Sequence, residues 1–181
     1  MSTATCVERP ILFSGEMVRA ILAGRKTQTR RIARPQPPTV EAANALSGPD
    51  YYTTNAGLRC PYGKPGDRLW VRETWAANAT LNLHKPSELR GESIYYRATH
   101  GNDSHFVWRP SIHMPKWASR ITLEITGVRV ERVDSISLED AIAEGFKGYG
   151  EFLRVFYELN RGRCTAADNP WAWVVEFRRI N

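Results

Sequence analysis

The stretch "SRITLEITGVRVERVDSI", residues 119–136, is the longest run of β-forming residues in the chain. Apolar residues alternate with polar ones up to Gly127 and alternate again after it, which predicts a long strand with a bulge or bend at that glycine. Three other segments have strand character: "DRLWVRETW", "SIYYRAT" and the final "NPWAWVVEFRRI". We therefore expect one curved sheet built from strands near 68–73, 94–98, 119–132 and 171–179.

Three segments place apolar residues at helical spacing. Ser14 and Ser137 are suitable N-caps for two of them, and Gly24 and Gly145 are suitable stops. The predicted helices lie near 15–23, 137–144 and 150–159. The strands are too few and too scattered for βαβ units, so we expect an α+β fold: a small, mostly antiparallel β-barrel with helices packed outside it or across its ends.

Two long loop insertions interrupt this pattern, at about 35–66 and 76–118. Both are rich in proline, glycine and other turn-forming residues. The second also carries many aromatic residues, which a disordered linker would lack, so we expect it to be ordered and packed. The length of 181 residues fits a single domain, residues 1–181.

The composition is that of an ordinary globular protein, 42% hydrophobic and 24% charged. No apolar run approaches the roughly 20 residues that cross a bilayer, and the first residues lack the apolar core of a secretion signal. The three cysteines are scattered, and neither they nor the histidines show metal-ligand spacing. We therefore predict a cytoplasmic protein with no membrane contact, no disulfide framework and no metal. The net charge of +6 favours polyanions as partners.

Positive charge concentrates in "ILAGRKTQTRRI", Ile21–Ile32, which contains no acid. Arg25, Lys26, Arg30 and Arg31 lie in an extended segment directly after the first predicted helix. Three interpretations are open: a solvated basic surface, a set of phosphate contacts, or a site where a lysine and a threonine do chemistry.

Several segments together resemble the ASCH domain family, whose barrel is related to the PUA RNA-binding fold. The most specific is the G-x-K-T-x-T-x-R pattern beginning at Gly24, which is followed later by a P-G-D turn. The others are "GKPGDRLWVRETW", "ITLEITGVRVERV", "DAIAEGF" and "NPWAWVVEFRRI". The two insertions resemble those of the larger phage- and prophage-associated members.

The resemblance implies two kinds of function. One branch is similar to small bacterial amidohydrolases that remove the acyl group of N4-acetylcytidine, using the lysine and the second threonine of the pattern and a glutamate further on. Carried over by motif, these residues are Lys26, Thr29 and Glu144, and no cofactor is implied. Other members bind RNA, and some are reported as ribonucleases. The alternatives are thus a non-enzymatic module for RNA or modified nucleic acid, or a metal-independent ribonuclease.

Amide hydrolysis needs an activated nucleophile and a proton donor for the leaving amine. Arg25 and Arg30 flank Lys26 and would lower its pKa, so that it could act as the base for the hydroxyl of Thr29. Glu144 would then deliver a proton to the exocyclic nitrogen of cytosine. In a regular strand, however, Lys26 and Thr29 would point to opposite faces, so they share a site only if the segment turns after Gly24.

Further candidates for substrate or nucleic-acid binding are Arg25, Arg30 and Arg31 in the basic segment, together with Glu73, Trp75 and Trp108. Glu73 ends a strand, where it would face a pocket mouth or pair with Arg72 or Arg31. Trp75 is a core residue or a base-stacking platform, and Trp108 either stacks on a base or packs its loop onto the barrel. The expected partner is a modified nucleoside or a nucleic acid, RNA rather than DNA.

Overall fold

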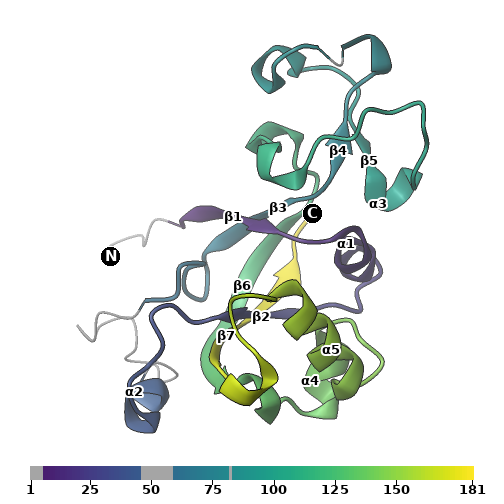
Figure 1. Cartoon of the computed structure of the whole chain (residues 1–181). Coiled ribbons are helices and arrows are strands. Elements are labelled where there is room, and N and C mark those ends of the chain that lie inside the picture. Colours follow the sequence, from purple (N-terminus) through teal and green to yellow (C-terminus); the bar gives the residue numbers. More distant parts are fainter. Residues whose placement is uncertain (1–5, 46–58, 82) are drawn as a thin grey trace, which may run out of the picture.

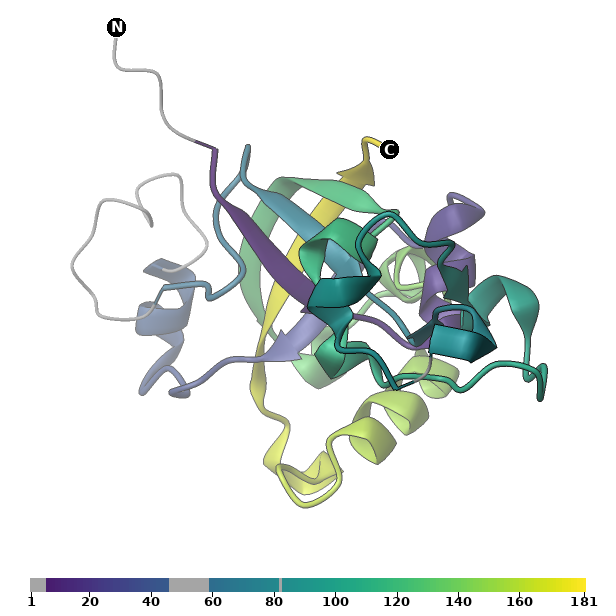
Figure 2. The same cartoon turned by 90° about the horizontal axis from the view of Figure 1, so that it is seen from above.

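The computed structural model describes residues 6–45, 59–81 and 83–181, and a five-stranded sheet lies at its centre (Figure 1). The strands are β1 (Glu8–Leu12), β2 (Gln28–Ile32), β3 (Arg68–Arg72), β6 (Thr122–Arg132) and β7 (Trp171–Arg179). Their order is β1-β3-β6-β7-β2. β1 and β3 are parallel, and the other neighbours in this sheet are antiparallel. The fold is therefore α+β with a mostly antiparallel sheet, and the strands cross one another at an angle when seen from above (Figure 2).

Three of the four strands expected in the sheet are confirmed as β3, β6 and β7. In β6 the alternation places Leu123 and Ile125 in the core. The bend predicted at Gly127 is a register shift between Ile125 and Gly127 in the pairing with β7. A Cβ at this glycine would lie 2.5 Å from Oε2 of Glu176, so a side chain there would displace the glutamate.

The prediction of a barrel is wrong, because β1 and β2 end the strand order and do not pair with each other in the described residues. In the described part of the chain, side-chain contacts, and not backbone hydrogen bonds, join the two strands. A guanidinium nitrogen of Arg31, in β2, donates to the carbonyl oxygen of Leu12 at 2.6 Å, and the guanidinium lies 5.3 Å from the ring centre of Phe13. Pro10 in β1 also has no N–H to donate. The sheet is therefore open on this side.

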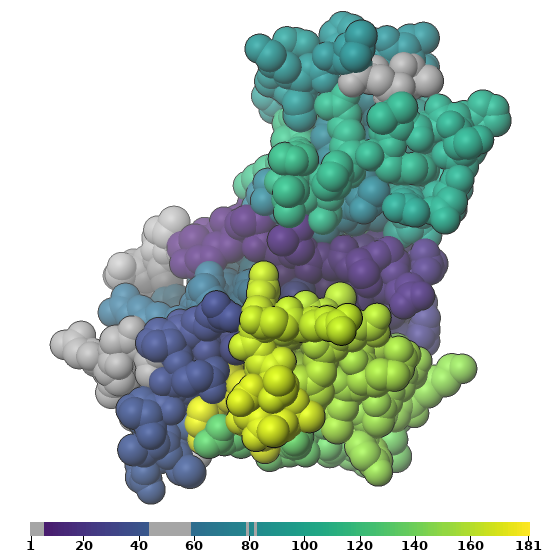
Figure 3. Space-filling view, in the orientation of Figure 1, coloured from purple at the N-terminus to yellow at the C-terminus, as the bar shows by residue number. Residues whose placement is uncertain are grey.

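The segment expected as a strand near 94–98 does not join the central sheet. β5 (Tyr95–Tyr96) pairs with β4 (Trp75–Ala76) in a separate two-stranded ribbon, and α3 (Arg97–His100) follows at once. Residues from β4 to about 118 form a lobe at one end of the sheet (Figures 1 and 3). The lobe has its own apolar cluster, which includes Trp75, Leu89 and Met114. This cluster gives the second insertion an ordered interior.

The three predicted helices are confirmed, with small differences at their ends. They are α1 (Gly15–Leu22), α4 (Leu138–Ala143) and α5 (Tyr149–Leu159). The hydroxyls of Ser14 and Ser137 accept hydrogen bonds from the first turns of α1 and α4, as expected of N-caps. The structure adds α2 (Val40–Ala45) and single 3-10 turns at Ala79–Leu81, Pro86–Leu89, Ser111–His113, Lys116–Ala118, Val133–Ser135 and Ala166–Asp168.

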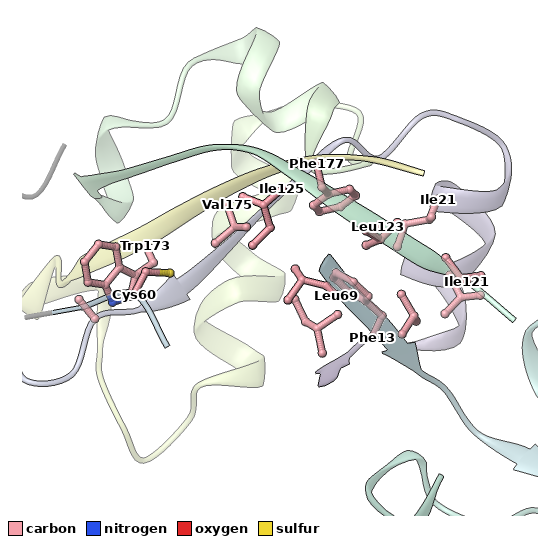
Figure 4. Packing of buried hydrophobic residues seen from close by; sticks show 14 of the residues in the cluster. Phe13, Ile21, Cys60, Leu69, Ile121, Leu123, Ile125, Trp173, Val175 and Phe177 are labelled. Atoms are coloured by element: carbon pink, nitrogen blue, oxygen red, sulfur yellow. The ribbon is translucent and has the colours of Figure 1, made fainter. Parts of the chain in front are cut away.

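The main core lies against the sheet and α1. Leu123, Trp173 and Phe177 from β6 and β7 pack there with Leu69 and Ile21 (Figure 4). A second cluster holds α4 and α5 against the sheet near β2. In the described part of the chain, no helix has both the length and the apolar character needed to cross a membrane.

Candidate functional site

A buried ion pair joins Lys26 to Glu144. Lys26 lies in the connection between α1 and β2, where its backbone N–H donates to the carbonyl oxygen of Ala20 at 3.1 Å. Glu144 is the C-cap residue of α4. The Nζ of Lys26 lies 2.8 Å from Oε2 and 2.7 Å from the backbone oxygen of Glu144. The two side chains are 0% and 3% exposed, so the pair is shielded from solvent.

Gly145 allows this close approach of α4 to the lysine. Its φ of +92° lies in the region that only glycine adopts without strain. A Cβ there would lie 3.1 Å from Cβ of Ala20 and 3.4 Å from Cβ of Lys26. The glycine that ends α4 therefore also determines how closely Glu144 and Lys26 meet.

Arg30 extends the ion pair into a buried network. Its guanidinium lies 3.5 Å from Oε1 of Glu144 and 2.8 Å from Oε2 of Glu131, and it also binds Asp140. Arg30 is therefore held among carboxylates, and the interpretation of this part of the segment as a solvated basic surface does not apply to it. Lys26 and Arg30 both reach Glu144. Thr29 and Arg31 lie on the face of β2 opposite to Arg30. The ring of Phe13 lies 5.3 Å from the guanidinium of Arg31 and 5.6 Å from Nζ of Lys26, so the lysine also reaches that face.

Burial lowers the pKa of Lys26 below its ordinary value, the carboxylate of Glu144 opposes this shift, and the charges of Arg31 and Arg30 add to it. The sequence predicted the direction of the shift but assigned it to neighbouring charges, including that of Arg25. Arg25 is exposed, and desolvation of the lysine is the main cause. A lysine with a lowered pKa is more readily available as a base.

A cavity of about 710 Å³ opens where β1 and β2 fail to pair. Thr29 and Glu144 both line it, together with residues of β1 and α5. Its aromatic lining residues are Phe13, Tyr62, Phe146, Phe152 and Phe156. Ligand pockets commonly measure about 300–1,000 Å³, so this cavity has the size of a small-molecule site.

A second cavity of about 580 Å³ adjoins the first. Ile32, Arg34 and Arg163 line both, so the two cavities meet at these residues. Cys164 and Asp168 also line the second cavity. The site thus comprises two adjoining cavities.

The predicted basic residues are placed differently from one another. Arg30 and Arg31 line the first cavity, and Arg25 is exposed and does not line either. Arg31 is half-buried, and its Nε has no hydrogen-bond partner in the described residues. The Nε of Arg30 likewise has no partner there, so both cavity-lining arginines keep a donor for a ligand.

Glu73 does not pair with Arg72 or Arg31. It is buried and makes a two-point ion pair with Arg120, at 2.9 and 3.0 Å. The guanidinium of Arg120 lies in turn 4.0 Å from the ring centre of Tyr96 in the lobe. Glu73 therefore connects the lobe to the sheet, and it does not line the cavities.

Neither predicted tryptophan lies at the cavities. Trp75 is fully buried in the lobe, edge-on to Trp117. Trp108 is half-buried, donates from Nε1 to the carbonyl oxygen of Asp103 at 3.3 Å, and packs 5.3 Å from Phe106. Trp75 thus has the environment of a core residue, and Trp108 belongs to the lobe surface.

Sequence reasoning missed the role of Asp140 in the network. Asp140 lies at N3 of α4, where its backbone N–H donates to Oγ of Ser137 at 3.1 Å. Its carboxylate, however, binds Arg30 and Arg129. Burial alone would raise the pKa of Asp140, but these two arginines hold it below its ordinary value. Among the described residues, no group of three or more His, Cys, Asp or Glu is arranged to hold a metal ion.

Comparisons with known proteins bear on the fold. No family model matches the sequence, and no curated protein matches it significantly. Among solved structures, the chain is similar to an ASCH domain from Lactobacillus crispatus JV V101, with a TM-score of 0.50 and 12% identity over 96% of this chain and 79% of that one. It is also similar to a protein of the DUF984 family from Enterococcus faecalis V583, with a TM-score of 0.47 and 13% identity over 97% of this chain and 81% of that one. The similarity to the ASCH domain shows that the chain has an ASCH-like fold.

Proposed function

We propose that the first cavity binds an N4-acylated cytosine derivative such as N4-acetylcytidine, and that Lys26, Thr29 and Glu144 hydrolyse its amide without a metal. The observation that carries this proposal is a single arrangement. Thr29 and Glu144 line one cavity of nucleoside size, and the lysine bound to that glutamate is buried and has a lowered pKa. Strongly perturbed titratable groups beside a cavity are typical of active sites.

The buried pair supplies both a base and an acid. The lowered pKa of Lys26 makes its neutral amine, which can accept a proton, easier to form. Nζ of Lys26 lies 2.8 Å from Oε2 of Glu144, so a proton taken up by the lysine can pass to the glutamate. Lys26 then acts as the base, and Glu144 delivers the proton.

The reaction then proceeds in two stages. Lys26 takes the hydroxyl proton of Thr29 as the threonine oxygen attacks the acyl carbonyl carbon. The carbon–nitrogen bond breaks as Glu144 delivers this proton, received from Lys26, to the exocyclic nitrogen. Cytidine leaves, and the acyl group stays on Thr29 as an ester. Water next hydrolyses this ester and releases the carboxylic acid.

The walls of the cavity suit a nucleobase. Phenyl rings from Phe13, Phe146, Phe152 and Phe156 offer apolar faces on which a planar base can pack. Arginine donors at the lining provide hydrogen bonds for carbonyl oxygens of the substrate. The cavity therefore combines a flat apolar surface with polar groups for orientation.

A non-enzymatic module that binds RNA is the second candidate. The net charge of +6 and the arginines around the cavities favour it. This module would need the basic lining but not Thr29. A substitution that removes only the hydroxyl of Thr29 therefore separates the two functions.

The test measures release of cytidine from N4-acetylcytidine by purified protein. Lys26→Met should abolish it by removing the base, and Thr29→Ala should nearly do so by deleting the nucleophile. Glu144→Gln should slow it by about 10²- to 10⁴-fold, the usual contribution of one general acid. Glu158→Gln, in an exposed ion pair with Arg154, is the matched control and should retain the wild-type rate.

Oligonucleotide binding and strand cleavage are measured on the same samples. Wild-type protein that binds RNA but leaves N4-acylcytidines intact would refute the amidohydrolase and support the binding module. Cleavage of the RNA strand that survives Thr29→Ala would support the ribonuclease instead.

A further inference from the structure

Positive charge dominates the lining of the first cavity. Its charged lining residues are five arginines and one carboxylate: Arg30, Arg31, Arg34, Arg72, Arg163 and Glu144. The carboxylate is already neutralised by Lys26 and Arg30. The remaining arginines therefore give the cavity a strong net positive charge, which a neutral nucleoside would not require.

Of the four remaining arginines, Arg34 and Arg163 have more donors left for a ligand than Arg31 and Arg72 have. Arg31 donates to the carbonyl oxygen of Leu12, and Arg72 donates from Nε to that of Met114. Arg34 and Arg163 are exposed, and neither forms an ion pair with a carboxylate in the part of the chain that the structure describes.

The one carboxylate that lines the second cavity beside them is already hydrogen-bonded elsewhere. Asp168 accepts from the backbone N–H of Thr165 at 2.6 Å and from its hydroxyl at 2.9 Å. These local bonds lower the pKa of Asp168, so it stays ionised and bound to its own turn. The guanidinium groups of Arg34 and Arg163 therefore keep donors for an incoming anion.

The position of this pair defines what kind of anion fits. Arg34 and Arg163 lie where the two cavities meet, whereas Thr29 and Glu144 line the first cavity only. A ligand whose base occupies the aromatic part of the first cavity would extend its sugar and substituents toward the junction. Two guanidinium groups that line the same two cavities suit a phosphate, which accepts several charge-assisted hydrogen bonds at once.

We propose that Arg34 and Arg163 form a phosphate subsite, and that the site takes a phosphate-bearing nucleotide in preference to a free nucleoside. This inference rests on the proposed function for the place of the base, and it names the class of substrate. The second cavity continues beyond the subsite, so it offers room for a further nucleotide of a strand. A mononucleotide and a strand share the same phosphate chemistry, and separate arms of the experiment distinguish them.

The experiment measures dissociation constants by calorimetry for unreacting product-like probes: cytidine, cytidine 5′-monophosphate, the dinucleotide CpC and inorganic phosphate. Wild-type protein should bind the monophosphate at least about tenfold more tightly than cytidine, as expected for one or more charge-assisted hydrogen bonds. Arg34→Gln and Arg163→Gln should each remove most of this preference and leave cytidine binding unchanged. Arg161→Gln changes an exposed arginine that lines neither cavity, and should leave the preference intact.

Raising the salt concentration provides a second readout. The affinity for the monophosphate should fall with salt, and that for cytidine should not. CpC binding more tightly than the monophosphate would identify a strand as the ligand, and equal or weaker binding would identify a mononucleotide. Equal affinities for cytidine and the monophosphate, or the same loss in Arg161→Gln as in Arg163→Gln, would overturn the subsite.

Failure of this inference differs from failure of the amidohydrolase. If N4-acetylcytidine is hydrolysed but phosphate adds nothing to binding, the subsite is wrong and the reaction stands. If no acylcytidine is hydrolysed but the monophosphate binds through Arg34 and Arg163, the subsite stands and the reaction is wrong.

Discussion

Substituting Lys26 should destabilise the fold by an amount that follows from its burial. The Lys26→Met change removes a fully buried cation and leaves the carboxylate of Glu144, 3% exposed, with a single charged neighbour, Arg30, at 3.5 Å. Breaking a buried pair on one side typically costs about 3–5 kcal/mol. Arg30 still compensates part of the charge and the methionine refills the volume, so we expect a loss of about 3 kcal/mol. Typical domains have about 5–15 kcal/mol of stability, so the variant should remain folded at 25 °C.

Urea denaturation followed by circular dichroism measures this loss. With a slope of about 2 kcal/mol per molar urea, the midpoint should fall by about 1.5 M. The double variant Lys26→Met/Glu144→Gln removes both charges and should be more stable than the sum of the single losses predicts. A coupling free energy of about 1–3 kcal/mol is expected for directly contacting groups.

The exposed pair of Arg154 and Glu158 provides the control cycle, because their side chains are 68% and 70% exposed at a separation of 3.5 Å. Its coupling should not exceed about 0.5 kcal/mol. If Lys26→Met shifts the midpoint no more than Arg154→Met does, the buried ion pair does not exist in solution as described.

The remaining predictions concern rate, backbone and the lobe. The value of kcat/KM for N4-acetylcytidine should rise as the pH rises through the lowered pKa of Lys26, because only the neutral amine can accept a proton. A rate that does not depend on pH would contradict the role of Lys26 as a base. Gly145→Ala should lower the free energy of unfolding by about 1–3 kcal/mol in urea denaturation, because the φ of Gly145 is +92°. Gly150→Ala in α5 is the control and should leave this free energy unchanged or raise it. Equal effects of the two substitutions would contradict the close approach at Gly145. Glu73→Gln breaks the ion pair with Arg120, so it should lower the melting temperature and leave kcat unchanged. A loss of kcat without a loss of stability would instead show that Glu73 acts in the catalytic site.

The predictable part of the fold is the part that local chemistry determines. The alternation around Leu123 and Ile125, the bend at Gly127 and the serine caps of α1 and α4 all depend on residues close in sequence. β1 was not predicted, because Pro10 lies inside it and it pairs in parallel with a strand about sixty residues later. Whether the sheet closes into a barrel depends on whether the edge strands β1 and β2 pair with each other. Local sequence does not determine this pairing, and the barrel prediction was wrong.

The site was predicted in part. Lys26 and Glu144 are 118 residues apart, and the resemblance to ASCH domains, not periodicity, named both. Sequence spacing could not show that Arg30 is buried among Glu131, Asp140 and Glu144, because such a network depends on how α4 packs against β2. It gave no indication that Arg163, at the far end of the chain, meets the same cavity.

The central claim is that Thr29 attacks an acyl group under the control of the buried Lys26–Glu144 pair. The most direct measurement mixes excess N4-acetylcytidine with purified protein, quenches in acid at short times, and determines both released cytidine and the mass of peptides that contain Thr29. The account predicts turnover by the wild type, with an acetyl group on Thr29 during turnover, and neither cytidine release nor the acetylated peptide in Thr29→Ala. Wild-type rates of cytidine release that persist in Thr29→Ala, or no release by the wild type at all, would contradict it.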